Sequence, residues 1–253
     1  MNSILDYPRV VCVLSFILLW GSVLGGAFVR KKLGPIEDDQ REFFGLVQTA
    51  ILTLLGLLIG FTFSMALGRY DQRKNYEEAE ANAIGTEYVR ADLLPAADAV
   101  KVRDLLRSYL DQRVLFYTTR DSQQLQQIDI RTTQLQDDLW SAVHAAAAAQ
   151  QTPTVALAAL GMNDVLNSEG YTQAAWWYRV PAQAWGLMAA IAICCNFLLG
   201  YGARRSGKFL FLVVPFAVAI SFYLIADIDS PRRGLVSVHP QNLLSLSQSL
   251  HPH

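Results

Sequence analysis

The stretch that decides the fold is FFGLVQTAILTLLGLLIGFTFSMAL, residues 43–67, which continues directly into GRYDQRKNYEEAEANAIGTEYVRADLLP, residues 68–95. The first part has no charged side chain, and its 25 residues exceed the ~20 that an α-helix needs to cross ~30 Å of hydrocarbon. The second part is rich in charge, has no proline before Pro95 and consists mainly of good helix formers. We therefore expect one long helix that leaves the bilayer and continues into a charged domain.

The chain as a whole has the composition of a membrane protein. Hydrophobic residues make up 52% and charged residues 17%, and the formal net charge of −1 gives no signal for nucleic-acid binding. The first apolar stretch is too long for a signal peptide and is followed by Arg30, Lys31 and Lys32, so we interpret it as a retained span. Four apolar stretches approach or exceed spanning length: residues 10–29, 43–67, 180–203 and 209–226.

These stretches divide the chain. We predict the first two transmembrane helices in 1–67, a helical extramembrane domain in 68–179, the third and fourth transmembrane helices in 180–227, and a short C-terminal tail in 228–253. Apolar spacing in the central segment predicts helices and no strand, the last of them at about 154–168 with a stop near Gly170. The predicted fold class is an all-α membrane protein with four transmembrane helices and a helical domain inserted between the second and third.

Four spans place both termini and the central domain on the same side of the membrane. Basic residues near the span ends are equally numerous on the two sides, and the weight of short loops favours a periplasmic central domain. The run Trp176-Trp177-Tyr178-Arg179 before the third span predicts an aromatic belt at the membrane interface. Asn196, a lone polar residue in that span, is expected to bond across helices.

The second span has two neighbouring faces with a spacing of four residues. One consists of the small residues Gly56, Gly60 and Ser64, which predict helix packing. The other consists of Thr49, Thr53, Leu57 and Phe61. This second face either packs on other helices or lines a path, and its threonine hydroxyls can bond back to their own helix.

No residue pattern predicts catalysis or metal binding. Cys12, Cys194 and Cys195 lie in apolar spans, which argues against a disulfide framework. The four histidines lack zinc-ligand spacing, and no phosphate loop or hydrolase motif is present. The span cores also lack the ionisable groups that mark intramembrane functional sites. We expect no cofactor, no metal and no enzymatic activity, and any pore would be lined by small, hydroxyl or apolar side chains.

Three motifs carry a resemblance to a known family. They are Ile59-Gly60-Phe61-Thr62-Phe63-Ser64 leading to Arg69, Asp71 and Arg73; Glu80-Ala81-Asn82-Ala83-Ile84-Gly85-Thr86 with Leu93-Leu94-Pro95; and the close formed by Asp227, Asp229, Pro231 and Gly234. Together with the order of spans and helical domain, they resemble the bacterial bestrophin-like membrane proteins. A more remote resemblance connects the chain to bestrophins, which are pentameric anion channels.

This resemblance implies a homo-oligomer, with a pentamer as the model, in the lipid bilayer of the bacterial inner membrane. It places the hydrophobic neck of bestrophins on Thr53, Leu57 and Phe61, where Thr53 departs from the apolar pattern. It also implies that the helix leaving the membrane lines a cytosolic vestibule, opposite to the side favoured by the charges. The residues after Gly234 are Leu235-Val236-Ser237, so the acidic run of the calcium site in eukaryotic bestrophins is missing.

Two functional hypotheses follow. The first is an oligomeric channel for small ions, with the second span lining the path. The alternative is a non-conducting scaffold or sensor whose helical domain binds a partner, with Arg103 and Arg107 on the binding face. The Thr49, Thr53, Leu57 and Phe61 face of the second span separates them, because a scaffold tolerates changes at Thr53 and Phe61.

Overall fold

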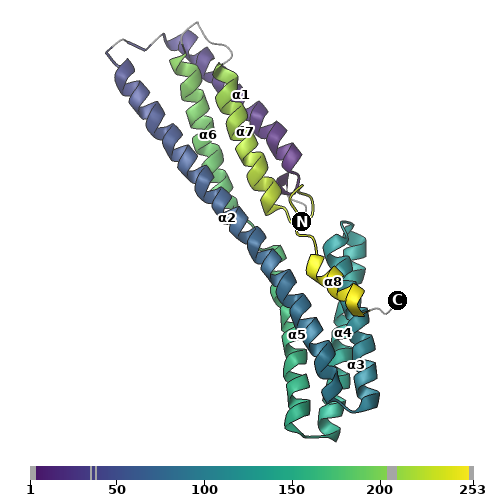
Figure 1. Cartoon of the computed structure of the whole chain (residues 1–253). Coiled ribbons are helices and arrows are strands. Elements are labelled where there is room, and N and C mark those ends of the chain that lie inside the picture. Colours follow the sequence, from purple (N-terminus) through teal and green to yellow (C-terminus); the bar gives the residue numbers. More distant parts are fainter. Residues whose placement is uncertain (1–3, 35, 38, 204–209, 251–253) are drawn as a thin grey trace. The chain divides into compact units, whose positions relative to one another are not determined.

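The computed structural model describes residues 4–34, 36–37, 39–203 and 210–250. Within these residues the chain is helical and has no strand. The predicted start of the fourth span at residue 209 and the loop 204–208 lie outside the described residues. The α-helices, labelled in Figure 1, are α1 (Pro8–Leu33), α2 (Arg41–Arg90), α3 (Ala96–Thr118), α4 (Ser122–Ala149), α5 (Pro153–Trp177), α6 (Ala182–Gly202), α7 (Leu210–Asp229) and α8 (Gln241–Leu250). Two short 3₁₀ helices are η1 (Ile4–Asp6) and η2 (Ala91–Leu93).

Helix α2 is continuous from Arg41 to Arg90, as the opening stretch of sequence predicts. Four helical segments, Pro8–Leu33, Arg41–Leu93, Pro153–Gly202 and Phe211–Asp229, are long and apolar enough to cross a membrane. The chain forms two compact units: unit 1 contains residues 1–70 and 179–237, and unit 2 contains residues 71–178 and 238–253.

Unit 1 has an apolar core between its helices. Leu19 of α1, Leu55 of α2, Met188 of α6 and Ile225 of α7 are buried in it. Helices α1 and α6 approach so closely that a Cβ added to Gly26 would overlap the carbonyl of Phe197, and one added to Gly200 would overlap that of Val23. Small residues allow such contact between backbones in membrane helices.

Unit 2 consists of α3, α4, α5, α8 and the part of α2 after residue 70. Its helix starts follow from local chemistry: the Asp121 carboxylate accepts hydrogen bonds from the backbone N–H groups of Gln123 and Gln124, which caps α4. Thr152 caps α5 by accepting from Val155 N–H, and Pro153 occupies the first helical position.

The predicted end of α5 near Gly170 is wrong, because α5 continues to Trp177. Its last two turns bury Thr172, Ala175 and Trp176, and this burial outweighs the weak helix propensity of glycine. The aromatic belt also needs correction. Trp176 is buried against Phe116 and Tyr117, whereas Trp177 and Tyr178 are exposed.

Candidate functional site

The predicted path-lining residues lie together on an uncovered face of α2. Thr49, Thr53, Leu57 and Phe61 are all exposed in the chain, with exposed fractions of 53% for Leu57 and 62% for Phe61. The hydroxyl of Thr49 donates to Gly45 O and that of Thr53 to Thr49 O, each at 2.9 Å. The threonines therefore satisfy their hydroxyls within α2, and the face offers a polar stripe followed by an apolar one.

The small residues of α2 lie on an uncovered side of the helix among the described residues. A Cβ added to Gly56 or Gly60 would meet no atom within 4 Å, and Ser64 is exposed. The close helix contact of unit 1 instead uses Gly26 and Gly200. Gly26 was visible in the sequence as one of several glycines in the first span, but nothing in the spacing singled out Gly200.

Asn196 differs from the sequence expectation. Its side-chain Nδ2 donates to Ala192 O of its own helix at 2.8 Å, and its Oδ1 has no partner among the described residues. Among the described residues, the Asn196 side chain therefore bonds one turn back on its own helix and not across helices, contrary to the expectation.

The residues of the span-exit motif have separate surroundings. In unit 1, Arg69 lies beside Met65, with 4.0 Å between Nη2 and Sδ. In unit 2, Asp71 is exposed, whereas Arg73 is buried. The Arg73 guanidinium donates to Ala175 O at 3.2 Å and to Tyr178 O at 3.4 Å. It thus binds the last carbonyls of α5, where a positive charge is favoured by the helix dipole.

The C-terminal motif folds into one compact turn of unit 1. Asp227 accepts from the backbone N–H groups of Leu235 and Val236 at 2.8 and 2.9 Å. Asp229 accepts from Val180 N–H at 3.1 Å. Pro231 is buried, and an added Cβ on Gly234 would overlap Asp227 O, so the turn requires glycine there.

Arg179 ties the same end of unit 1 together. It donates to Asp229 O at 2.9 Å and pairs with Asp6 at 2.7 Å. The turn after α7, the entrance to α6 and η1 are thereby joined by charged and backbone groups.

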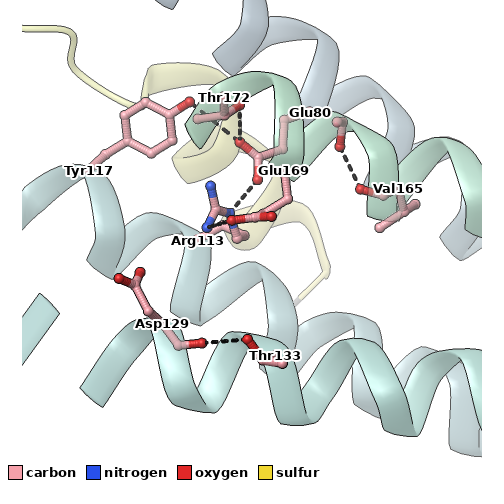
Figure 2. Close-up of polar contacts among 9 residues, drawn as sticks. Glu80, Arg113, Tyr117, Asp129, Thr133, Val165, Glu169 and Thr172 are labelled. Carbon is pink, nitrogen blue, oxygen red and sulfur yellow. Dashed lines mark hydrogen bonds and ion pairs between the residues drawn. The ribbon is translucent and has the colours of Figure 1, made fainter. Parts of the chain in front are cut away.

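Unit 2 contains a buried ionic cluster that sequence reasoning missed. Figure 2 shows the guanidinium of Arg113 on α3 reaching the carboxylates of Glu80 on α2 and Glu169 on α5. The Nε of Arg113 pairs with Glu80, and its Nη1 lies 3.5 Å from Oε1 of Glu169. The second oxygen of Glu80 accepts from Thr172 at 3.1 Å and Tyr117 at 3.4 Å. Three helices are therefore joined by one charge cluster.

The electrostatics of this cluster follow from burial and pairing. Burial alone would lower the pKa of Arg113, but the charge of Glu80 and its hydrogen bond raise it above the ordinary value. Burial raises the pKa of Tyr117 and, against the charge of Arg113, that of Glu169. Arg113 therefore stays charged, and its signal in the sequence was its place on the buried face of α3, one turn after Tyr109 and Leu110.

Two further glutamates of α2 are buried in unit 2. Glu77 accepts from Asn242 N–H at 2.9 Å and Leu243 N–H at 3.0 Å, so it caps the start of α8. Glu87 has neither carboxylate oxygen bonded within the described residues, and burial raises its pKa to about 8. Gly161 of α5 leaves the space that Glu87 occupies.

The proposed partner face of the alternative hypothesis is engaged within unit 2. Arg107 donates to Leu250 O at the end of α8 at 3.0 Å and pairs with Asp104 at 2.7 Å. Arg103 pairs with Asp92. The guanidinium groups of Arg103 and Arg107 each lie 5.3 Å from the ring centre of Tyr88. Among the described residues, no group of three or more His, Cys, Asp or Glu side chains is arranged to hold a metal ion.

The fold and these sites define a helical membrane protein in which four apolar helical segments are combined with a polar helical unit. Residues 16–243 match the model of the Bestrophin-like domain, so the chain belongs to the bestrophin-like family. No curated protein matches its sequence.

Solved structures of a bacterial bestrophin homolog from Klebsiella pneumoniae share the fold. One, at 14% identity, covers 96% of this chain and 98% of that chain with a TM-score of 0.65. A variant of that homolog with a single substitution, at 11% identity, covers 99% of this chain and 96% of that chain with a TM-score of 0.64. At these identities, the likeness shows the fold alone.

Proposed function

We propose that this chain forms an oligomeric channel for small ions in the bacterial inner membrane, with α2 lining the path. The single observation that carries the proposal is the uncovered face of α2. A membrane helix with unpacked Gly56 and Gly60 beside exposed Leu57 and Phe61 has a small-residue surface for a second helix and an apolar stripe beside it. Membership of the bestrophin-like family supports the same reading, because bestrophins are anion channels.

In this proposal, copies of the chain associate around an axis, as a pentamer by analogy with bestrophins. Gly56, Gly60 and Ser64 contact a neighbouring copy, and Thr53, Leu57 and Phe61 face the axis. Apolar side chains at a constriction gate a pore by dewetting, and the hydroxyl of Thr53 adds a polar step at one end. The domain of residues 68–179 lies outside the bilayer between the second and third spans and extends the path, on the same side as both termini.

The test is ion flux from liposomes that contain the purified oligomer. Phe61→Ala should raise the flux several-fold, because removal of the ring widens and wets the constriction. Phe28→Ala is the matched control, since Phe28 is an equally exposed phenylalanine on α1. If substitutions at Thr53, Leu57 and Phe61 leave the flux unchanged, this face does not line the path. A stable oligomer without flux would favour the scaffold instead.

A further inference from the structure

Glu87 lies in a notch between the end of α2 and α5, within unit 2. Its exposed fraction is 0%. The notch exists because position 161 of α5 is glycine: an added Cβ on Gly161 would overlap Oε2 of Glu87 and crowd Nη1 of Arg90. The backbone of α5 therefore lies directly against the carboxyl group, and a hydrated carboxylate does not fit between the two helices.

The two oxygens of the Glu87 carboxyl group are shielded from hydrogen-bond donors and from water. Neither oxygen is hydrogen-bonded to a described residue, and each has almost no accessible surface. Glu77 and Glu80 differ, since the first accepts from backbone N–H groups and the second pairs with Arg113. An unbonded buried carboxylate is costly, and such a group takes up a proton instead. A water molecule or a metal ion has no room against these oxygens, whereas a proton needs none.

Two charged side chains act on Glu87, one from each helix that forms the notch. Burial raises the pKa of Glu87 to about 8, Arg90 on α2 opposes this shift, and Asp164 on α5 adds to it. Asp92 of η2, the next segment along the chain, is largely exposed and pairs with Arg103. In the notch, the neutral form of Glu87 is therefore favoured up to a higher pH than in water.

We propose that Glu87 is a proton-controlled latch between the end of α2 and α5. While its carboxyl group is neutral, Glu87 sits against Gly161 and the two helices pack together. When the proton is lost, the carboxylate requires water. Because the backbone of α5 closes the notch, α5 separates from the end of α2 to admit that water. The latch goes beyond the proposed channel, since it responds to pH whether or not the oligomer conducts ions.

The experiment is a fluorescence-quenching titration of the full-length oligomer from pH 5 to pH 9. A bimane probe is attached at Leu160→Cys on α5, and the quencher is Thr86→Trp on α2. Both positions are exposed, and each is the chain neighbour of a residue of the notch. Cys12, Cys194 and Cys195 are replaced by alanine, so that a single thiol is labelled. Quenching is measured against the same labelled chain without Thr86→Trp, which removes any direct effect of pH on the probe.

In the labelled parent chain, quenching should be strong at pH 5 and mostly lost by pH 9, because the tryptophan quenches the probe only while the helices are close. Glu87→Gln should keep the quenching at every pH, since the amide has the shape of the neutral acid. Gly161→Ala should lack it already at pH 5, because the methyl group fills the notch. Asp164→Asn should retain part of it at pH 9, since the charged carboxylate is repelled less. Glu78→Gln, at an exposed glutamate of α2, is the matched control and should behave as the parent chain does.

Circular dichroism of the same samples distinguishes the latch from unfolding. The helix content should stay constant from pH 5 to pH 9 while the quenching is lost. A loss of helix that accompanies the loss of quenching would overturn the proposal, because the chain then unfolds instead of opening at the notch. The proposal would also fail if the parent chain keeps its quenching throughout, or if Glu87→Gln loses quenching as the parent chain does. None of these results depends on ion flux.

Discussion

The two units use the same helix, α2, in opposite ways. In unit 1 its buried positions are Leu55, Thr62 and Ala66, whereas in unit 2 four of its buried positions are charged, Arg73, Glu77, Glu80 and Glu87, beside the apolar Ala81 and Ile84. Both units have an apolar core, to which unit 1 adds a close glycine contact and the Arg179–Asp6 ion pair, and unit 2 adds the buried ion pair of Arg113 with Glu80. Apolar contacts specify little in a bilayer, because lipid tails are as apolar as the core.

The largest expected effect of this difference is at Arg113. Arg113→Met should lower the free energy of unfolding by about 3–5 kcal/mol, because Glu80 is left buried without its partner. The double variant Arg113→Met, Glu80→Leu should recover much of the loss, since the stranded charge is removed. Arg103→Met, at a partly exposed pair with Asp92, should cost no more than about 1 kcal/mol. Denaturant unfolding of the detergent-purified protein measures all three.

Equal losses for Arg113→Met and Arg103→Met would break the comparison, because they would show that the buried cluster contributes no more than a surface pair. Hydrogen exchange read by mass spectrometry assigns the loss to a unit. Protection should fall in α3, α4 and α5 and be retained in α1, α6 and α7.

The sequence predicts the first unit better than the second. Long apolar runs predict spans because length and lack of charge are sufficient, and α2 and the start of α5 follow from proline and cap positions. The periodicity of α3 was harder to interpret. Val100 and Leu115 have the apolar spacing but are exposed, whereas Arg113 is fully buried. A charged residue on a buried face can be predicted only when its partners are known. The partners of Arg113, Glu80 and Glu169, lie on other helices.

The candidate path-lining face shows another limit of prediction from the sequence: the spacing identifies the residues but not their role. Spacing alone finds Thr49, Thr53, Leu57 and Phe61 on one face and Gly56, Gly60 and Ser64 on its neighbour. Both faces are exposed among the described residues, so no contact seen there fixes their role. The C-terminal motif, in contrast, is explained within the chain, because Asp227 and Asp229 bind backbone N–H groups that no spacing rule would have paired with them.

The second-largest expected effect is a pH dependence of the stability of unit 2 that arises from Glu87. Its pKa of about 8 in the fold exceeds the ordinary value of 4.5, chiefly because of burial. Arg90 opposes this shift and Asp164 adds to it. The folded state therefore binds the proton more tightly than the unfolded chain. The contribution of Glu87 protonation to the free energy of unfolding should be fully present below pH 4.5. It should fall by about 2 kcal/mol between pH 6 and pH 8.

Glu87→Gln should remove this slope, because the amide has the shape of the neutral acid and does not titrate. Glu78→Gln is the control, since Glu78 is the exposed neighbour of buried Glu77 on the same helix. Unfolding measured from pH 5 to pH 9 distinguishes them. If Glu87→Gln keeps the wild-type slope, another group of unit 2 binds the proton, and the charged core is less sensitive to Glu87 than its geometry implies.

The smallest expected effect contrasts two kinds of glycine in unit 1. Gly200→Ala should cost about 1–3 kcal/mol, because the new methyl group overlaps the backbone of Val23 and forces α1 and α6 apart. Gly56→Ala meets open space and should stabilise the isolated chain by about 0.5–1 kcal/mol through helix propensity. Size-exclusion chromatography with light scattering adds the decisive reading. If Gly56 contacts a neighbouring copy as proposed, Gly56→Leu should weaken the oligomer while each chain stays folded. Gly200→Ala should instead lower the free energy of unfolding of the chain itself. An oligomer that tolerates leucine at both Gly56 and Gly60 would place the subunit contact on another face and leave the exposed side of α2 to lipid.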